Sequence, residues 1–205
     1  MRLGVLGGAF NPPHTGHMVL AQEALVQLKL DSVLLMPMGQ PPHRRIDADP
    51  GAEVRAELCE AAVAGDERME VSRIELEREG PSYTVDTLIA LREERPGDEL
   101  FWILGGDQAA ALHSWHQPEK VLELCTIGVT ERAGWRQGGI LLELRHLRHE
   151  DRLLFFEMPA IAISSTMVRR RAALRDPIRY LVPDGVAELI ESRGLYGADA
   201  AVGAS

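Results

Sequence analysis

"GGAFNPPHTGH", residues 7–17, is a turn rich in glycine, proline and histidine that lies almost at the start of the chain. Residues 2–7, which lead into this turn, are mostly apolar and have the length and composition of a buried strand. Residues 15–28 after it are good helix formers with apolar side chains at helical spacing. Because Pro12 and Pro13 prevent the helix from starting earlier, the stretch is predicted to connect a strand tightly to a helix.

The two histidines of this turn indicate a phosphate site. Thr15 is the expected N-cap of the helix, so His17 lies in the first helical turn, where unpaired backbone N–H groups and the helix dipole favour an anion. The glycines leave room for a ligand near the backbone, and His14 and His17 add side-chain donors. The alternative is a structural role, in which the imidazoles only satisfy nearby carbonyl groups. We expect the turn to bind phosphate.

Strand-like and helix-like segments alternate along the rest of the chain. This alternation predicts an α/β, Rossmann-like fold, a doubly wound and mainly parallel sheet with helices on both faces. Ligands bind such sheets beyond the carboxyl ends of strands, where the strand order reverses. The histidine turn and "LGGDQ" (104–108) both follow strands, so we expect them to be the walls of one crevice. Further strands are expected at 32–37, 70–72, 101–104, 125–130 and 153–157, and helices at 50–64, 83–95, 107–113, 118–124, 165–174 and 183–193.

Length and composition restrict the class of protein. The chain of 205 residues suits one domain, which we place at residues 1–196, with a helical C-terminal part from about 160 to 196 and a disordered tail at 197–205. No apolar run approaches the roughly 20 residues that span a bilayer, and no signal-peptide pattern is present, so a cytoplasmic location is expected. Cys59 and Cys125 have no metal-ligand spacing and are expected to be buried free thiols.

The charge of the chain limits its partners. A net charge of −9 argues against a broad nucleic-acid surface, whereas small anions remain accessible through local donors. The cationic side chains are arginines apart from Lys29 and Lys120. A phosphate clamp in this chain would therefore consist mainly of arginine and histidine, with bidentate geometry available.

A second phosphate-binding stretch is "ISSTMVRRR", residues 163–171. Ser164 or Ser165 can cap a helix, and Arg169 lies within the next turn. Hydroxyls, N–H groups and a guanidinium at one helix start suit a polyphosphate. An ordinary capped helix with an arginine-rich exposed face is the alternative.

Three further stretches carry less information. "QPPHRR" (40–45) places His43 and Arg44 on a loop that could fold over phosphates. In "GGDQ", Asp107 could accept hydrogen bonds from ribose hydroxyls or could be only a helix cap. "HLRHE" (146–150) holds two histidines three residues apart without a third metal ligand nearby, so we interpret it as helix surface.

The two phosphate stretches together resemble the nucleotidyltransferases that carry an H-x-G-H turn and an S-S-T-x-x-R helix. Among these, the sequence is most similar to the bacterial nicotinate mononucleotide adenylyltransferases. The similarity extends from Arg2 to about Tyr196, with one departure: Ala133 stands where relatives commonly have proline after the arginine at 132. The supporting residues are "PPHR" (41–44), "PSYTVDTL" (81–88), "LGGDQ" (104–108), Trp115 and "YLVP" (180–183).

The resemblance implies that ATP and nicotinate mononucleotide give deamido-NAD and pyrophosphate, a step in NAD biosynthesis. It implies catalytic roles for His17 and Arg169, and Mg²⁺ that is bound mainly by the ATP phosphates and water, with no metal site built by the protein. Contacts to ATP are expected from Gly8, Ala9, Phe10, His14, His43, Arg44, Gly105, Asp107, Ser164, Ser165 and Thr166, and contacts to the mononucleotide from Tyr83, Thr84, Trp115 and Arg132.

Other functions stay open at this point. A related adenylyltransferase could act on nicotinamide mononucleotide or phosphopantetheine, and a protein without turnover could be a nucleotide-binding regulator. We expect small-molecule substrates and neither a nucleic-acid nor a membrane partner. The sequence leaves open a homo-oligomer, the strictness of the preference for the acid, and loop motions on binding.

Overall fold

The structure, a computed structural model, describes residues 1–41, 45–131 and 136–197. Within them six strands, all parallel, form one sheet in the order β3-β2-β1-β4-β5-β6, which confirms the predicted parallel α/β sheet. The strands are β1 (Arg2–Gly8), β2 (Ser32–Pro37), β3 (Met69–Val71), β4 (Glu99–Gly105), β5 (Thr126–Thr130) and β6 (Leu153–Phe156).

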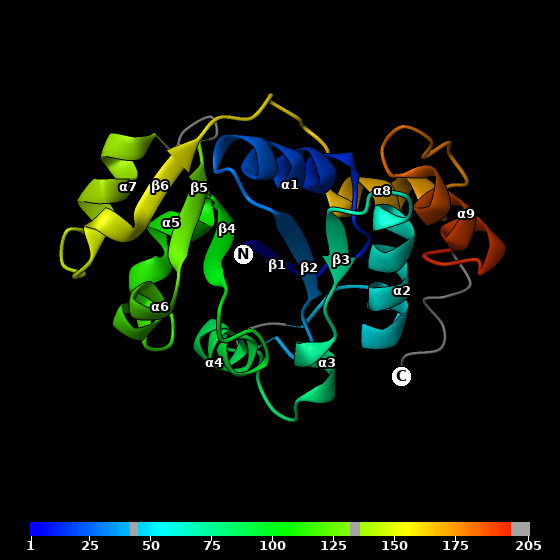
Figure 1. The fold of residues 1–205 in the computed structure, drawn as a ribbon. Helices are drawn as coiled ribbons and strands as arrows, with labels where there is room; N and C mark the ends of the chain where they lie inside the picture. The colour runs from blue at the N-terminus through cyan, green and yellow to red at the C-terminus, as the bar shows by residue number, and fades with distance from the viewer. Residues whose placement is uncertain (42–44, 132–135, 198–205) are drawn as a thin grey trace.

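Helices cover both faces of the sheet, as predicted (Figure 1). One face packs against apolar side chains of α1 and α2, and the other against those of α4, α5, α6 and α7. This double cover buries both sides of each central strand, so β2 is apolar along most of its length. The bounds are α1 (Thr15–Gln27), α2 (Ala52–Val63), α3 (Ile74–Glu77), α4 (Thr84–Glu94), α5 (Gly106–Ala110), η1 (Leu112–Ser114), α6 (Pro118–Leu124), α7 (Gln137–Leu144) and η2 (Glu150–Arg152).

The last helices, α8 (Ser165–Ala173) and α9 (Asp184–Ser192), form a small core of their own with α2. Val168 of α8 and Val186 of α9 are fully buried there beside Leu58 of α2. Figure 1 shows α8 and α9 next to α2, at the end of the molecule opposite β6 and α7. The assignment of residues 1–196 to one domain stays a prediction, and residues 198–205 of the expected tail lie outside the described residues.

Two α-helices of the described residues, α3 and α7, were not predicted. α3 is too short to show a periodicity. α7 starts at Gln137 and has Gly138 and Gly139, which are poor helix formers, in its first turn, but Ile140 and Leu144 lie one turn apart and are buried in the core. Tertiary packing therefore outweighs the low intrinsic helix propensity of this segment.

In residues 146–150 the two histidines are exposed, as expected, but the prediction that they lie on a helix is wrong. α7 ends at Leu144, and the chain turns so that Leu147 packs against the core. The backbone N–H of Arg148 donates to both carboxylate oxygens of Glu119, at 3.0 and 3.1 Å, and this contact holds the turn away from a helical path.

Both cysteines are free and buried, as predicted. Burial raises the pKa of the Cys59 thiol above its usual range and that of Cys125 to about 12. Both side chains therefore behave as small apolar core residues.

Candidate active site

The candidate site lies at the carboxyl ends of β1 and β4. These strands are neighbours in the sheet, and the strand order reverses between them. Their parallel register pairs Val5 with Trp102, which brings Gly8 to the level of Gly105. The histidine turn and "GGDQ" therefore lie at the same edge of the sheet, the usual ligand position in such folds.

The histidine turn has a defined hydrogen-bond geometry. His14 is the N-cap of α1 and is 8% exposed. Its backbone N–H donates to Nδ1 of His17 at 3.1 Å, and the two rings stack with centroids 3.7 Å apart. A Cβ at Gly16 would lie 3.1 Å from the His14 ring, so the glycine between the histidines permits the stacking. Because Nδ1 of His17 accepts a hydrogen bond, the proton of the neutral ring is on Nε2.

The prediction that Thr15 is the N-cap is wrong, because His14 occupies that position and Thr15 is the first helical residue. Thr15 instead attaches the turn to the segment before α9. Its backbone N–H donates to the carbonyl oxygen of Leu181 at 2.9 Å, and its Oγ1 to that of Tyr180 at 3.1 Å. The "YLVP" segment thus supports the histidine turn from outside.

α8 brings the second phosphate stretch to the first. Ser164 is its N-cap, with Oγ accepting from the N–H of Met167 at 3.2 Å. Ser165 Oγ donates to the carbonyl oxygen of Pro12 at 2.8 Å. Arg169 donates from Nη1 to the carbonyl oxygen of Asn11 at 2.8 Å and from Nη2 to Thr166 Oγ1 at 3.3 Å. The two motifs, about 150 residues apart in sequence, form one surface.

The segment between β6 and α8 makes this meeting possible. It crosses over α1 from the β6 side of the molecule to α8 (Figure 1). Gln27 fixes the start of this segment through two hydrogen bonds with the backbone of Glu157. Gln27 Nε2 donates to the Glu157 carbonyl oxygen at 2.6 Å, and Gln27 Oε1 accepts from the Glu157 N–H at 3.1 Å. Further along, Ile161 lies close to Gly16 in the histidine turn.

Arg55 of α2 is a site-supporting residue that was not predicted. Its guanidinium has no exposed surface and donates to the carbonyl oxygens of Ala9 (3.0 Å) and Gly39 (3.3 Å) and to Asp49 (2.9 Å). It therefore joins the turn after β1 to the loop after β2. A signal was present in the sequence, since helical spacing places Arg55 on the same face as Leu58 and Cys59.

A second part of the site lies where α4 begins. Tyr83 is the N-cap and Thr84 the first helical residue, so both stand at a helix start, as predicted. The Tyr83 ring contacts the ring of His116, with centroids 4.5 Å apart. The neighbouring Trp115 is half-buried and packs against the same core as Tyr83. The structure thus brings together three predicted mononucleotide contacts and adds His116, which the sequence did not single out.

A buried carboxyl group supports this second part. Glu75 is 5% exposed and accepts from Thr87 Oγ1 at 2.8 Å. Burial raises its pKa, and hydrogen bonds from Thr87 and Ser82 together with the charge of Arg78 oppose the increase. The backbone N–H of Ser82 donates to the carbonyl oxygen of Gln40 at 2.8 Å, so the start of α4 is attached to the loop after β2.

The remaining predicted residues fall into three groups. Gly8 ends β1, and the Phe10 ring is buried in the core, which leaves only the backbone of Phe10 for the expected ATP contact. Gly105 is the N-cap of α5, which excludes Asp107 as the cap and leaves its exposed carboxylate for the ribose role. His43, Arg44 and Arg132 lie outside the described residues.

The chemistry of the crevice suits anions. The imidazoles of His14 and His17, hydroxyls, backbone N–H groups at the starts of α1 and α8 and the Arg169 guanidinium lie at this edge of the sheet, and all of these groups can donate hydrogen bonds. In residues 1–41, 45–131 and 136–197, no three His, Cys, Asp or Glu side chains form a group that could hold a metal ion. Over the same ranges no helix has the length and apolar character that a membrane span requires.

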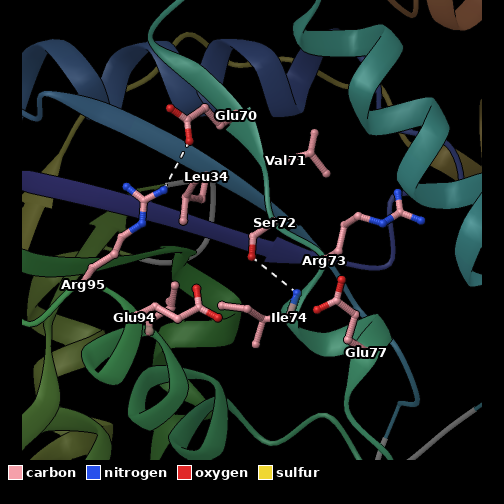
Figure 2. Close-up of a pocket in the computed structure, with 10 residues that line it drawn as sticks. Leu34, Glu70, Val71, Ser72, Arg73, Ile74, Glu77, Glu94 and Arg95 are labelled. Carbon is pink, nitrogen blue, oxygen red and sulfur yellow. Dashed lines mark hydrogen bonds and ion pairs between the residues drawn. The ribbon is translucent and has the colours of Figure 1, made fainter.

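A cavity of about 230 Å³ lies elsewhere, beside β3 and α4 (Figure 2). None of the predicted site residues lines it. Its arginines are paired, Arg95 with Glu70 and Arg73 with Glu53 and Glu60. We therefore do not assign it a ligand.

Comparison with known proteins agrees with this geometry. The cytidylyltransferase-like family matches residues 5–171. The nicotinate-nucleotide adenylyltransferase of Bacillus subtilis is 35% identical over 195 residues, which cover 95% of this chain and 98% of that protein. The probable nicotinate-nucleotide adenylyltransferase of Corynebacterium kroppenstedtii is 42% identical over 205 residues, which cover 100% of this chain and 95% of that one.

A solved structure supports the fold. The nicotinic acid mononucleotide adenylyltransferase of Plasmodium falciparum, complexed with NaAD, is similar with a TM-score of 0.74 and 17% identity, over 95% of this chain and 97% of that one. The sequence matches, the parallel sheet and the paired phosphate motifs are consistent with one another. This chain belongs to the nicotinate-nucleotide adenylyltransferases, within the cytidylyltransferase-like family.

Proposed function

We propose that His17 and Arg169 stabilise the transition state of the reaction of this family, adenylyl transfer from ATP to nicotinate mononucleotide, which forms deamido-NAD in NAD biosynthesis. A phosphate oxygen of the mononucleotide attacks the α-phosphorus of ATP. The new P–O bond forms as the bond to the bridging oxygen of the β-phosphate breaks, and pyrophosphate leaves with that electron pair. Because the attacking phosphate is already an anion at neutral pH, catalysis requires positioning and charge stabilisation rather than a general base.

The observation that carries the proposal is the hydrogen bond from the His14 backbone to His17 Nδ1. It fixes the ring orientation and leaves the proton on Nε2, which can donate to an α-phosphate oxygen as negative charge develops there. His14 stacks on this ring and limits its movement. Both imidazoles belong to the start of α1, whose dipole favours the same charge.

Arg169 is assigned to the leaving pyrophosphate. One guanidinium nitrogen is held by the Asn11 carbonyl oxygen and another by Thr166, which orients the planar group. Its remaining N–H bonds can form a bidentate contact with the β- and γ-phosphates. Thr166 and the backbone at the start of α8 would bind the same phosphates, and Asp107 would bind the ribose.

The nicotinate ring is assigned to the start of α4. The first-turn N–H groups and the Thr84 hydroxyl are donors that suit a carboxylate, and Trp115 offers a surface for stacking. Mg²⁺ would enter as part of the substrate MgATP, because the described residues offer no group of three His, Cys, Asp or Glu side chains that could hold the ion. The contacts of His43, Arg44 and Arg132, a homo-oligomer and the cytoplasmic location stay predictions.

The proposal is tested by the release of pyrophosphate from MgATP and nicotinate mononucleotide. His17→Ala should lower kcat by about 10² to 10³, the usual effect of removing one donor to a developing oxyanion. Arg169→Lys should lower kcat/KM for ATP although the charge is kept. His146→Ala, which changes an exposed histidine in the turn after α7, is the matched control and should leave both constants unchanged.

Unchanged kcat in His17→Ala, with the melting temperature also unchanged, would exclude the catalytic assignment. Replacing nicotinate mononucleotide in the same assay by nicotinamide mononucleotide or phosphopantetheine separates the alternative acceptors. Tight ATP binding without pyrophosphate release from any of them would indicate the regulatory alternative.

A further inference from the structure

The chain beyond α9 returns to the histidine turn. Tyr196 lies just after the last helix and is only 7% exposed. Its hydroxyl donates to Oδ1 of Asn11 at 2.7 Å, a contact between side chains 185 residues apart in sequence. The C-terminal segment therefore reaches the turn that carries His14 and His17.

The amide of Asn11 has only one orientation that satisfies its surroundings. Asn11 is 2% exposed, and its Nδ2 donates to the carbonyl oxygens of Asp47 at 2.8 Å and Ala48 at 3.3 Å. Exchanging the amide oxygen and nitrogen would place an acceptor against those two acceptors, which is unfavourable. Tyr196 must therefore be the donor and Asn11 Oδ1 the acceptor.

The backbone of the same asparagine holds the proposed catalytic arginine. The Asn11 carbonyl oxygen accepts from Arg169 Nη1 at 2.8 Å. Asn11 thus links Tyr196, through its side chain, to Arg169, through its backbone. The Tyr196 contact is thus one of the side-chain hydrogen bonds that fix the residue whose carbonyl oxygen orients the guanidinium.

We infer that Tyr196 is a positioning residue for adenylyl transfer, which acts through Asn11 to hold Arg169 in the orientation that stabilises the leaving pyrophosphate. The inference rests on the proposed role of Arg169. Burial raises the pKa of the Tyr196 phenol, so the hydroxyl keeps its proton and remains the donor that Asn11 requires. Phenylalanine would fill the same volume but leave the buried Oδ1 of Asn11 without this donor.

The first test compares Tyr196→Phe with Tyr180→Phe in the pyrophosphate-release assay. Tyr180 is 79% exposed and offers the turn only its backbone oxygen, so its hydroxyl can be removed as a control. Tyr196→Phe should lower kcat about tenfold, the effect of one lost hydrogen bond in a buried network, with KM for both substrates changed by less than about twofold. Tyr180→Phe should match the unmodified protein.

Both variants are assayed well below their melting temperatures, so that only folded protein is compared. Tyr196→Phe with a lower melting temperature but unchanged kcat would overturn the inference, because the contact would then be only structural. A rise in KM for ATP at constant kcat would also overturn it, since it would indicate loss of ground-state binding.

A double-mutant cycle with Arg169→Lys tests the route through the arginine. If Tyr196 acts through Arg169, Tyr196→Phe should cost less than about twofold in kcat in the Arg169→Lys background. Equal losses in both backgrounds would overturn the inference. The unmodified enzyme and Arg169→Lys alone report on the proposed function, so a failure of that function is recognised separately.

Discussion

The Arg55 guanidinium is buried and makes three hydrogen bonds, so the loss of its planar shape should destabilise the fold. A lysine at this position could not reach Asp49 and the two carbonyl oxygens together, because it has one nitrogen instead of a planar fork. Arg55→Lys should therefore lower the free energy of unfolding by about 1–3 kcal/mol, the cost of leaving buried carbonyl oxygens without a donor, measured by urea denaturation. Arg68→Lys, which changes an exposed arginine paired with Asp66, should have no measurable effect. Equal stability of the two variants would contradict the supporting role of Arg55.

Glu75 predicts a pH dependence of stability. Because burial raises its pKa in the native state, the folded protein keeps this proton to a higher pH than the unfolded chain does. The native state therefore binds more protons between the two pKa values, and its stability falls as the pH rises from the ordinary value of 4.5 through the raised one.

Glu75→Gln removes this titration. Relative to the unmodified protein, the free energy of unfolding of the variant should increase as the pH rises from about 4 to about 8. Glu77→Gln, at an exposed position of the same short helix, should follow the unmodified protein at every pH. Parallel curves for Glu75→Gln and the unmodified protein would be evidence against the shifted titration.

At the scale of the elements, α8 depends on its N-cap. Ser164 satisfies the N–H of Met167, which would otherwise be unpaired at the helix start. Ser164→Ala should cost about 1 kcal/mol in the free energy of unfolding, whereas Ser192→Ala near the end of α9 should cost much less. If the two variants are equally stable, the cap contributes nothing to α8.

The sequence predicts elements whose signals are local. Pro12, Pro13 and the histidines marked the turn after β1, and the serines before Arg169 marked the start of α8. It could not predict contacts that depend on the path of the chain, such as Tyr196 with Asn11 or Arg169 with the Asn11 carbonyl oxygen. α7 was missed for the opposite reason, because its first residues disfavour the helix that packing imposes.

At the scale of the molecule, the sheet and one long crossing assemble the site. The strand order brings Gly8 and Gly105 to one edge of the sheet. The segment between β6 and α8, which Gln27 holds at its start, crosses α1 and places α8 beside the histidine turn. A protein with a net charge of −9 can thus bind two anionic substrates, because local donors rather than the total charge determine the potential in the crevice.

A preference for the acid is expected from the proposed contacts at the start of α4. The donors at the start of α4 would be left unpaired or misoriented by an amide, and a buried unpaired donor costs far more than a solvated one. Thr84→Val should reduce the preference for the acid, and Trp115→Ala should weaken the use of both mononucleotides, because stacking does not distinguish them.

The most direct measurement is kcat/KM of the unmodified protein for nicotinate and for nicotinamide mononucleotide with MgATP, with pyrophosphate release as the readout. The expected result is turnover with nicotinate mononucleotide and a preference for it of at least about 10²-fold, which corresponds to roughly 2.7 kcal/mol at the transition state. Comparable values for the two mononucleotides, or turnover with nicotinamide mononucleotide alone, would contradict the assignment.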